Sequence, residues 1–60
     1  MKEWNERRLK DFFRANFDKN TCQCRIENEK LIVVDSDSQS IRFEIKDTRI
    51  FSPDTQKFYS

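Results

Sequence analysis

The spacing of apolar residues changes after Asn20, and this change constrains the fold more than any other feature of the sequence. Before it, over residues 2–17, apolar side chains recur with the period of a helix and gather on one arc. After it, apolar and polar residues alternate with a period of two, which is typical of half-buried strands. A helix followed by strands within 60 residues predicts a single small α+β domain spanning residues 1–60.

Alternation and short apolar runs predict three strands, at about 21–27, 30–35 and 40–46. A two-residue turn at 28–29 and a three-residue turn at 36–38 place Leu31 and Val33 on the same face as Cys24 and Phe43. A slip of one residue would break this agreement. We therefore expect an N-terminal helix, residues 2–17, packed on the inner face of a three- to four-stranded antiparallel meander. Residues 48–60 would form a C-terminal strap that adds a strand or folds over the outer face.

Cys22 and Cys24 are the only cysteines, and the chain has no histidine. A structural zinc site needs four Cys or His ligands, so this chain offers half a site that only a dimer could complete. A disulfide between residues i and i+2 of a strand has unfavourable geometry. We expect both thiols to pack as small hydrophobes and expect no cofactor; a metal or redox role is the alternative.

Catalysis has little support in this sequence. There is no glycine-rich phosphate loop and no nucleophile with a recognisable base. The stretch DSDSQS, residues 35–40, begins like a calcium loop, but Ser40 and Lys46 stand where glycine and glutamate are required. We therefore read it as a turn and expect a protein that is not an enzyme.

The outer side of the predicted sheet is the favoured partner-binding surface. Ile32 and Val34 point away from the helix in the predicted register, and Arg25 and Arg42 are their neighbours. An apolar centre with arginines around it is typical of a protein-binding patch. Trp4 lies off the main helical arc and is a further candidate contact. The alternative is that aromatic residues of the strap cover this patch.

A second candidate surface is the basic side of the helix. Arg7, Lys10 and Arg14 lie within one arc and could contact phosphates of a nucleic acid. Asp11, Asp18 and Glu3 are placed to pair with the two arginines, which favours a solvated, ion-paired surface.

Charge and composition limit the classes of function that this chain can have. The net charge of +1 gives no general attraction to nucleic acids or anionic membranes, and no apolar run is long enough to span a bilayer. The N-terminal stretch MKEWNERRLK is charged where a signal peptide is apolar, so we expect a cytoplasmic protein.

We expect a small binding protein that occupies a surface of a larger macromolecule, with a protein as the partner. The small size and the glycine-free composition, which suggests an AT-rich genome, favour a phage or mobile-element inhibitor of a host or defence enzyme. Two alternatives stay open: a nucleic-acid-binding module that uses the basic helix, and a self-assembling protein, such as a homodimer, that pairs through an exposed edge strand.

Overall fold

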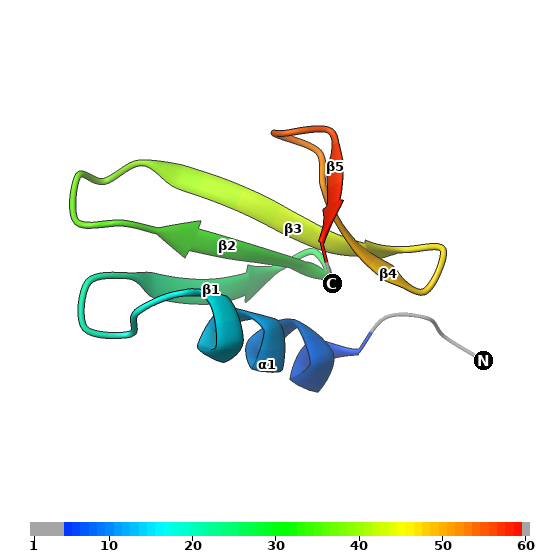
Figure 1. Cartoon of the computed structure of the whole chain (residues 1–60), viewed down its shortest axis with the longest axis horizontal. Coiled ribbons are helices and arrows are strands. Elements are labelled where there is room, and N and C mark those ends of the chain that lie inside the picture. The colour runs from blue at the N-terminus through cyan, green and yellow to red at the C-terminus, as the bar shows by residue number, and fades with distance from the viewer. Residues whose placement is uncertain (1–4, 60) are drawn as a thin grey trace.

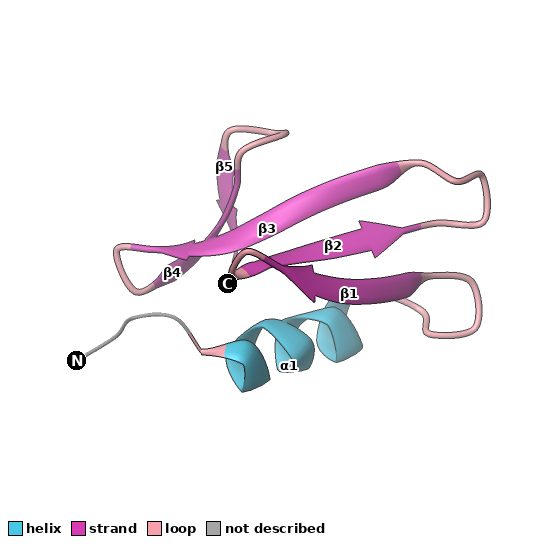
Figure 2. Ribbon diagram, turned by 180° about the vertical axis from the view of Figure 1, so that it is seen from behind, coloured by secondary structure: helices cyan, strands magenta, loops and turns pink. Residues whose placement is uncertain are grey.

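The computed structural model describes residues 5–59 and contains one helix followed by a five-stranded antiparallel sheet. The elements are α1 (Glu6–Asn16), β1 (Gln23–Glu27), β2 (Lys30–Val34), β3 (Ser40–Lys46), β4 (Arg49–Ser52) and β5 (Lys57–Tyr59). Each strand pairs with the next one along the chain, so the sheet is a meander. Figures 1 and 2 show α1 lying along one side of the sheet, while β5 runs across the direction of β1–β3. The predicted α+β class is confirmed.

Helix α1 is shorter than the predicted helix over residues 2–17. It begins at Glu6 because Asn5 is the N-cap, and the Asn5 side chain accepts a hydrogen bond from the Arg8 N–H at 3.3 Å. It ends at Asn16 because Phe17 adopts an extended conformation, although the Phe17 N–H still donates to the Phe13 carbonyl oxygen at 2.9 Å. The first three residues of the predicted helix, 2–4, lie outside the described part of the chain.

The predicted register of the first three strands is confirmed. Cys24 lies opposite Val33, Val33 lies opposite Ile41, and Leu31 lies opposite Phe43. Only the strand ends differ: β1 begins two residues later than predicted and β2 ends one residue earlier. The β2 end is set by Asp35, whose carboxylate accepts backbone hydrogen bonds from the following loop at 2.9 and 3.0 Å.

The connections between strands use left-handed backbone without glycine. Within residues 5–59, six residues have a positive φ, between 49° and 64°: Asn28, Glu29, Ser38, Asp47, Thr48 and Gln56. Two consecutive left-handed residues form the short turn of each two-residue hairpin, because that geometry matches the twist of the strands. The β1–β2 and β3–β4 connections are both of this kind.

Of the two courses predicted for residues 48–60, the C-terminal segment takes the first: it adds to the sheet, with two strands where one was predicted. Strand β3 is longer than β2, and its second half extends past the β2 pairing. Strand β4 pairs with this free half, placing Ile50 opposite Ile45, and β5 then pairs with β4. Ile50 is buried, so the extension enlarges the core. The sheet therefore has five strands instead of the three to four predicted.

The core lies between α1 and the inner face of the sheet. Phe43 is at its centre, 1% exposed, with its ring centroid 4.9 Å from that of Phe12 and 5.4 Å from that of Tyr59. The buried apolar residues are Leu9, Phe12, Phe13, Leu31, Val33, Phe43 and Ile50. Since alternate strand residues point to opposite sides, this core determines which side chains face outward.

Candidate functional site

The candidate site is the outer face of the sheet, defined as the strand residues that point away from α1. Figure 2 shows that α1, the one helix among residues 5–59, lies on the other side of the sheet. The outer face comprises Gln23, Arg25, Glu27, Lys30, Ile32, Val34, Ser40, Arg42, Glu44, Lys46, Arg49, Phe51 and Phe58. These positions alternate with the buried residues of β2, β3 and β4.

The structure brings together four of the five predicted partner contacts. Ile32 lies between Arg25 on β1 and Arg42 on β3, with Val34 two residues further along β2. Ile32 and Val34 are half-buried, whereas both arginines are exposed. We call these four residues the central patch. Trp4, the fifth predicted contact, lies outside the described residues.

Both arginines of the central patch are held by carboxylates of the same chain. The Arg25 Nε lies 2.6 Å from a Glu27 carboxylate oxygen. The Arg42 guanidinium donates to Asp54 at 2.8 Å, and the backbone N–H of Arg42 donates to the other Asp54 oxygen at 2.7 Å. These contacts fix the positions of the two guanidinium groups at the rim of the apolar centre.

Asp54 is a site residue that sequence reasoning missed. It lies in the β4–β5 loop, which is organised by the buried Ser52: the Ser52 hydroxyl oxygen accepts from the N–H groups of Asp54 and Thr55, each at 3.3 Å. The Arg42 side chain, followed by the Arg42 backbone N–H, lowers the pKa of Asp54. The same hydrogen bond raises the pKa of Arg42. No local pattern reveals a pair that is twelve residues apart.

The Arg42–Asp54 pair predicts a pH dependence of stability. Because the pKa of Asp54 is lower in the folded chain than its ordinary value of 3.8, ionised Asp54 stabilises the fold above that value, and this contribution is lost as the pH falls through the folded pKa. The stability difference between wild type and Asp54→Asn, measured by urea unfolding, should therefore shrink as the solution is acidified below about pH 4.

NMR titration supplies the control for this prediction. In Arg42→Gln, the carboxyl resonance of Asp54 should titrate at a higher pH than in wild type, because the charged partner is gone. An unchanged Asp54 titration in this variant would contradict the proposed cause.

A second group on the outer face lies at the β4–β5 end, and we call it the cation–aromatic cluster: Lys46, Arg49, Phe51 and Phe58. The two phenyl rings pack with their centroids 4.9 Å apart. The Arg49 Cζ lies 3.8 Å from the Phe58 centroid, and the Lys46 Nζ lies 4.6 Å from the Phe51 centroid. Phe58 is 41% exposed and is the one exposed large hydrophobic side chain among residues 5–59.

Sequence reasoning also missed this cluster. In the alternative given above, aromatic residues of the strap cover the central patch. Phe51 and Phe58 are instead neighbours on two paired strands. The sequence does contain a pattern that indicates the cluster, but it spans only three residues. Ile50 points inward, so its neighbours Arg49 and Phe51 must share the outer face. Tyr59, the third aromatic residue of this segment, packs against the core instead.

The basic side of α1 is an ion-paired surface, as expected. Arg7 and Arg14 both approach Asp11, at 3.9 and 2.5 Å, and Lys10 approaches Glu6 at 2.7 Å. Asp18 does not take part as predicted; its carboxylate instead accepts the Asn20 N–H at 2.8 Å. All three cations of this surface are therefore already close to a carboxylate.

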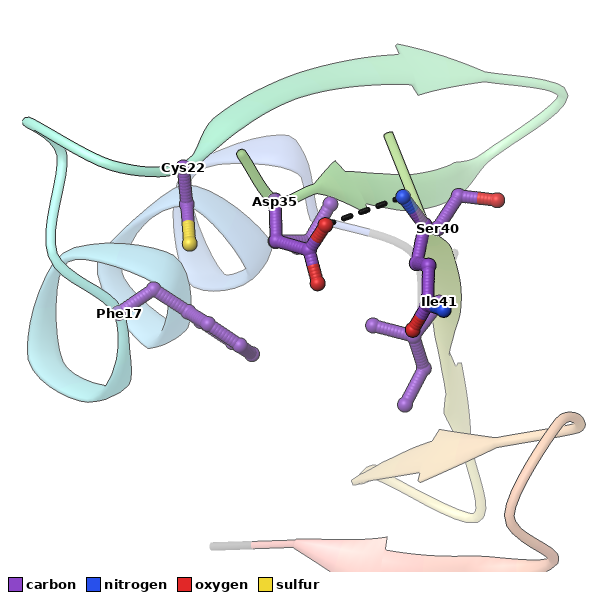
Figure 3. Close-up of a pocket in the computed structure, with 7 residues that line it drawn as sticks. Phe17, Cys22, Asp35, Ser40 and Ile41 are labelled. Atoms are coloured by element: carbon purple, nitrogen blue, oxygen red, sulfur yellow. Dashed lines mark hydrogen bonds between the residues drawn. The ribbon is translucent and has the colours of Figure 1, made fainter. Parts of the chain in front are cut away.

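The two cysteines are half-buried, are not joined by a disulfide, and pack against the core cluster. Figure 3 shows the Cys22 thiol pointing toward the Phe17 ring, at a pocket of about 160 Å³ that Asp35, Ser40 and Ile41 also line. The Asp35 carboxylate there is occupied by loop N–H groups. Among residues 5–59 no group of three or more His, Cys, Asp or Glu side chains could hold a metal ion.

Comparison with known proteins adds one short match. A family model described as a CXCXC repeat matches residues 16–25. Cys22 and Cys24 supply two cysteines of that pattern, but Asn20 and Ile26 occupy the positions where a third would stand. The match covers far less than half of the chain and does not assign it to a family. No curated protein and no solved structure matches the chain.

In the part of the chain described here, no helix has the length and apolar character needed to cross a membrane.

Proposed function

We propose that this protein is a small, non-enzymatic binding protein whose outer sheet face occupies a surface of a larger protein. The observation that carries this proposal is the central patch on the side of the sheet opposite α1. There half-buried Ile32 lies between two arginines, and half-buried Val34 follows it on the same strand face. Partner association would complete the burial of these two aliphatic side chains, which is favourable because it removes apolar surface from water.

The composition of the patch favours a protein as the partner. Protein interfaces combine an apolar centre with a polar rim, and arginine is enriched among the residues that dominate their binding energy. Arg25 and Arg42 are held in place by Glu27 and Asp54, so less side-chain freedom is lost when they contact a partner.

The most concrete form of the proposal is a phage or mobile-element protein that inhibits a host or defence enzyme in the cytoplasm. Such a protein needs no active site of its own, because inhibition follows from covering a surface of the target. Because the one described helix lies behind the sheet, the strands would present their outer-face residues to the target.

The nucleic-acid alternative is less favoured by the geometry. A cation that already pairs with a carboxylate has to give up that contact before it can neutralise a phosphate. Arg7, Lys10 and Arg14 are all in that position. Self-assembly is the other alternative, and the open edges at β1 and β5 favour it as the route by which two copies would pair.

Ile32→Asp tests the proposed function. A carboxylate at position 32 removes the aliphatic centre of the patch and has to be desolvated in the complex, so we expect affinity for the natural partner to fall by about 30-fold or more. The partner is captured from a lysate of the source cell with the wild-type protein and identified, and its affinity for both proteins is measured by calorimetry.

Asn20→Asp is the matched control, because it adds the same charge in the α1–β1 loop, outside the outer face. It should bind like wild type, and both variants should unfold cooperatively in urea. Unchanged affinity of a folded Ile32→Asp protein would remove the outer face from consideration.

A further inference from the structure

The cations of the outer face differ in whether a carboxylate within residues 5–59 pairs with them. Arg25 pairs with Glu27, Arg42 pairs with Asp54, and Lys30 lies 3.7 Å from the Glu44 carboxylate. Lys46 and Arg49 are the exception: no carboxylate within residues 5–59 approaches either of them to 4 Å. They contact phenyl rings instead.

Cation–π contacts orient these two side chains without neutralising them. Such a contact is weak at an exposed site, and the full positive charge remains. Lys46 and Arg49 lie directly opposite each other on β3 and β4, so the two charges are neighbours. The cation–aromatic cluster therefore combines a doubly positive spot with Phe58, the one exposed large apolar side chain in the described part of the chain.

We propose that the cation–aromatic cluster binds an acidic segment of a protein partner, in which carboxylates flank an apolar side chain. This inference rests on the proposed function and specifies the chemistry of the partner at one end of the outer face. A partner that buries Phe58 must also desolvate Arg49, which lies over its ring. Burying that charge is costly unless the partner supplies an anion, and two carboxylates would match Arg49 and Lys46.

Two other kinds of partner, a second copy of the chain and a nucleic acid, fit the cation–aromatic cluster less well. In a symmetric dimer through this cluster, the Lys46 and Arg49 pair of one copy would face the same pair of the other, and like charges would repel. A nucleic acid would be attracted to the two cations, but the whole chain carries a net charge of only +1 and most other outer-face cations are already paired. Charge complementarity at a small apolar spot favours a short acidic protein segment.

The test uses NMR spectra of the isotope-labelled protein with three probes at low salt. The first is a synthetic peptide with glutamates on both sides of a phenylalanine, the second replaces the glutamates with glutamines, and the third is an oligothymidylate. We expect the acidic peptide alone to give saturable shifts of the Lys46, Arg49, Phe51 and Phe58 amides. In the double variant Lys46→Gln/Arg49→Gln, its affinity should fall by about tenfold or more.

Arg25→Gln/Lys30→Gln is the matched control, because it removes two cations of the same face that are already paired. It should change the affinity of the acidic peptide by less than about twofold. The inference is overturned if the acidic peptide gives no saturable shifts, if the glutamine peptide binds equally well, if the control variant loses as much affinity, or if the oligothymidylate binds more tightly at the cluster.

Measuring the affinity of the variants for the natural partner distinguishes a failure of this inference from a failure of the proposed function. If Ile32→Asp loses the partner while Lys46→Gln/Arg49→Gln keeps full affinity, the outer face is the binding surface and the acidic-segment inference fails. If both proteins keep full affinity, the proposed function fails as well. Loss of affinity for the natural partner in both variants, with Asn20→Asp binding normally, supports both proposals.

Discussion

Phe43→Ala will leave a large fraction of the protein unfolded at room temperature. Phe43 is 1% exposed, and its ring packs against those of Phe12, Phe17 and Tyr59 with centroid distances of 4.9, 5.8 and 5.4 Å. Replacing a buried phenylalanine with alanine costs about 3–5 kcal/mol. A domain of this length has a total stability of roughly 3–9 kcal/mol. The thin core of a 60-residue chain favours the lower half of that range, where this single change removes most of the stability. Far-UV circular dichroism during thermal and urea unfolding measures the loss.

Phe58→Ala is the matched control for this prediction, since it removes the same side chain from the outer face. Phe58 is 41% exposed, and the free energy of unfolding should fall by no more than about 1 kcal/mol. Equal losses in the two variants would mean that the ring of Phe43 is not at the centre of the core.

The second large effect is expected from a pair of adjacent valines on β2. Val33 is 2% exposed beneath α1, whereas Val34 points to the outer face. Val33→Asp places a carboxylate in the core without a partner, and we expect a loss of about 3–5 kcal/mol, enough to prevent stable folding. Val34→Asp places the same group at the solvated face, and we expect a loss of about 1 kcal/mol or less.

This pair tests the strand register directly. A register shifted by one residue would exchange the faces of the two valines, so Val34→Asp would then be the damaging change. Urea unfolding of both variants, with amide spectra to confirm the native fold of Val34→Asp, distinguishes the two registers.

The first three strands were predictable because their faces constrain one another. Leu31 and Val33 had to share a side with Cys24 and with Phe43, and only one choice of turn lengths satisfied both pairings. The helix was predictable from its apolar arc, but its start was not, because Asn5 acts as a cap only in its local backbone conformation.

The C-terminal strands were harder to predict because β4 and β5 are too short to display a period. Strand β5 spans only Lys57–Tyr59, and an alternating pattern needs more residues before it can be distinguished from a loop. The free half of β3 that recruits β4 becomes apparent only when the lengths of β2 and β3 are compared in the folded sheet.

The central patch could be predicted from the register alone, because cross-strand neighbours follow from the pairing. Asp54 and the cation–aromatic cluster could not, because both depend on where the C-terminal strands lie. The sequence therefore predicted one end of the outer face and missed the end that carries the cation–aromatic cluster.

The glycine-free turns have a consequence for the order of folding. Asn28 and Asp47 adopt the left-handed conformation readily, but for the other four residues it costs about 1 kcal/mol or more each, so the loops oppose hairpin formation locally. An isolated hairpin of this chain would then be a poor nucleus, because a two-stranded ribbon is marginal even with a favourable turn. Docking of α1 on the apolar side chains of β2 and β3 has to compensate for that cost, which couples helix and strands into one cooperative transition.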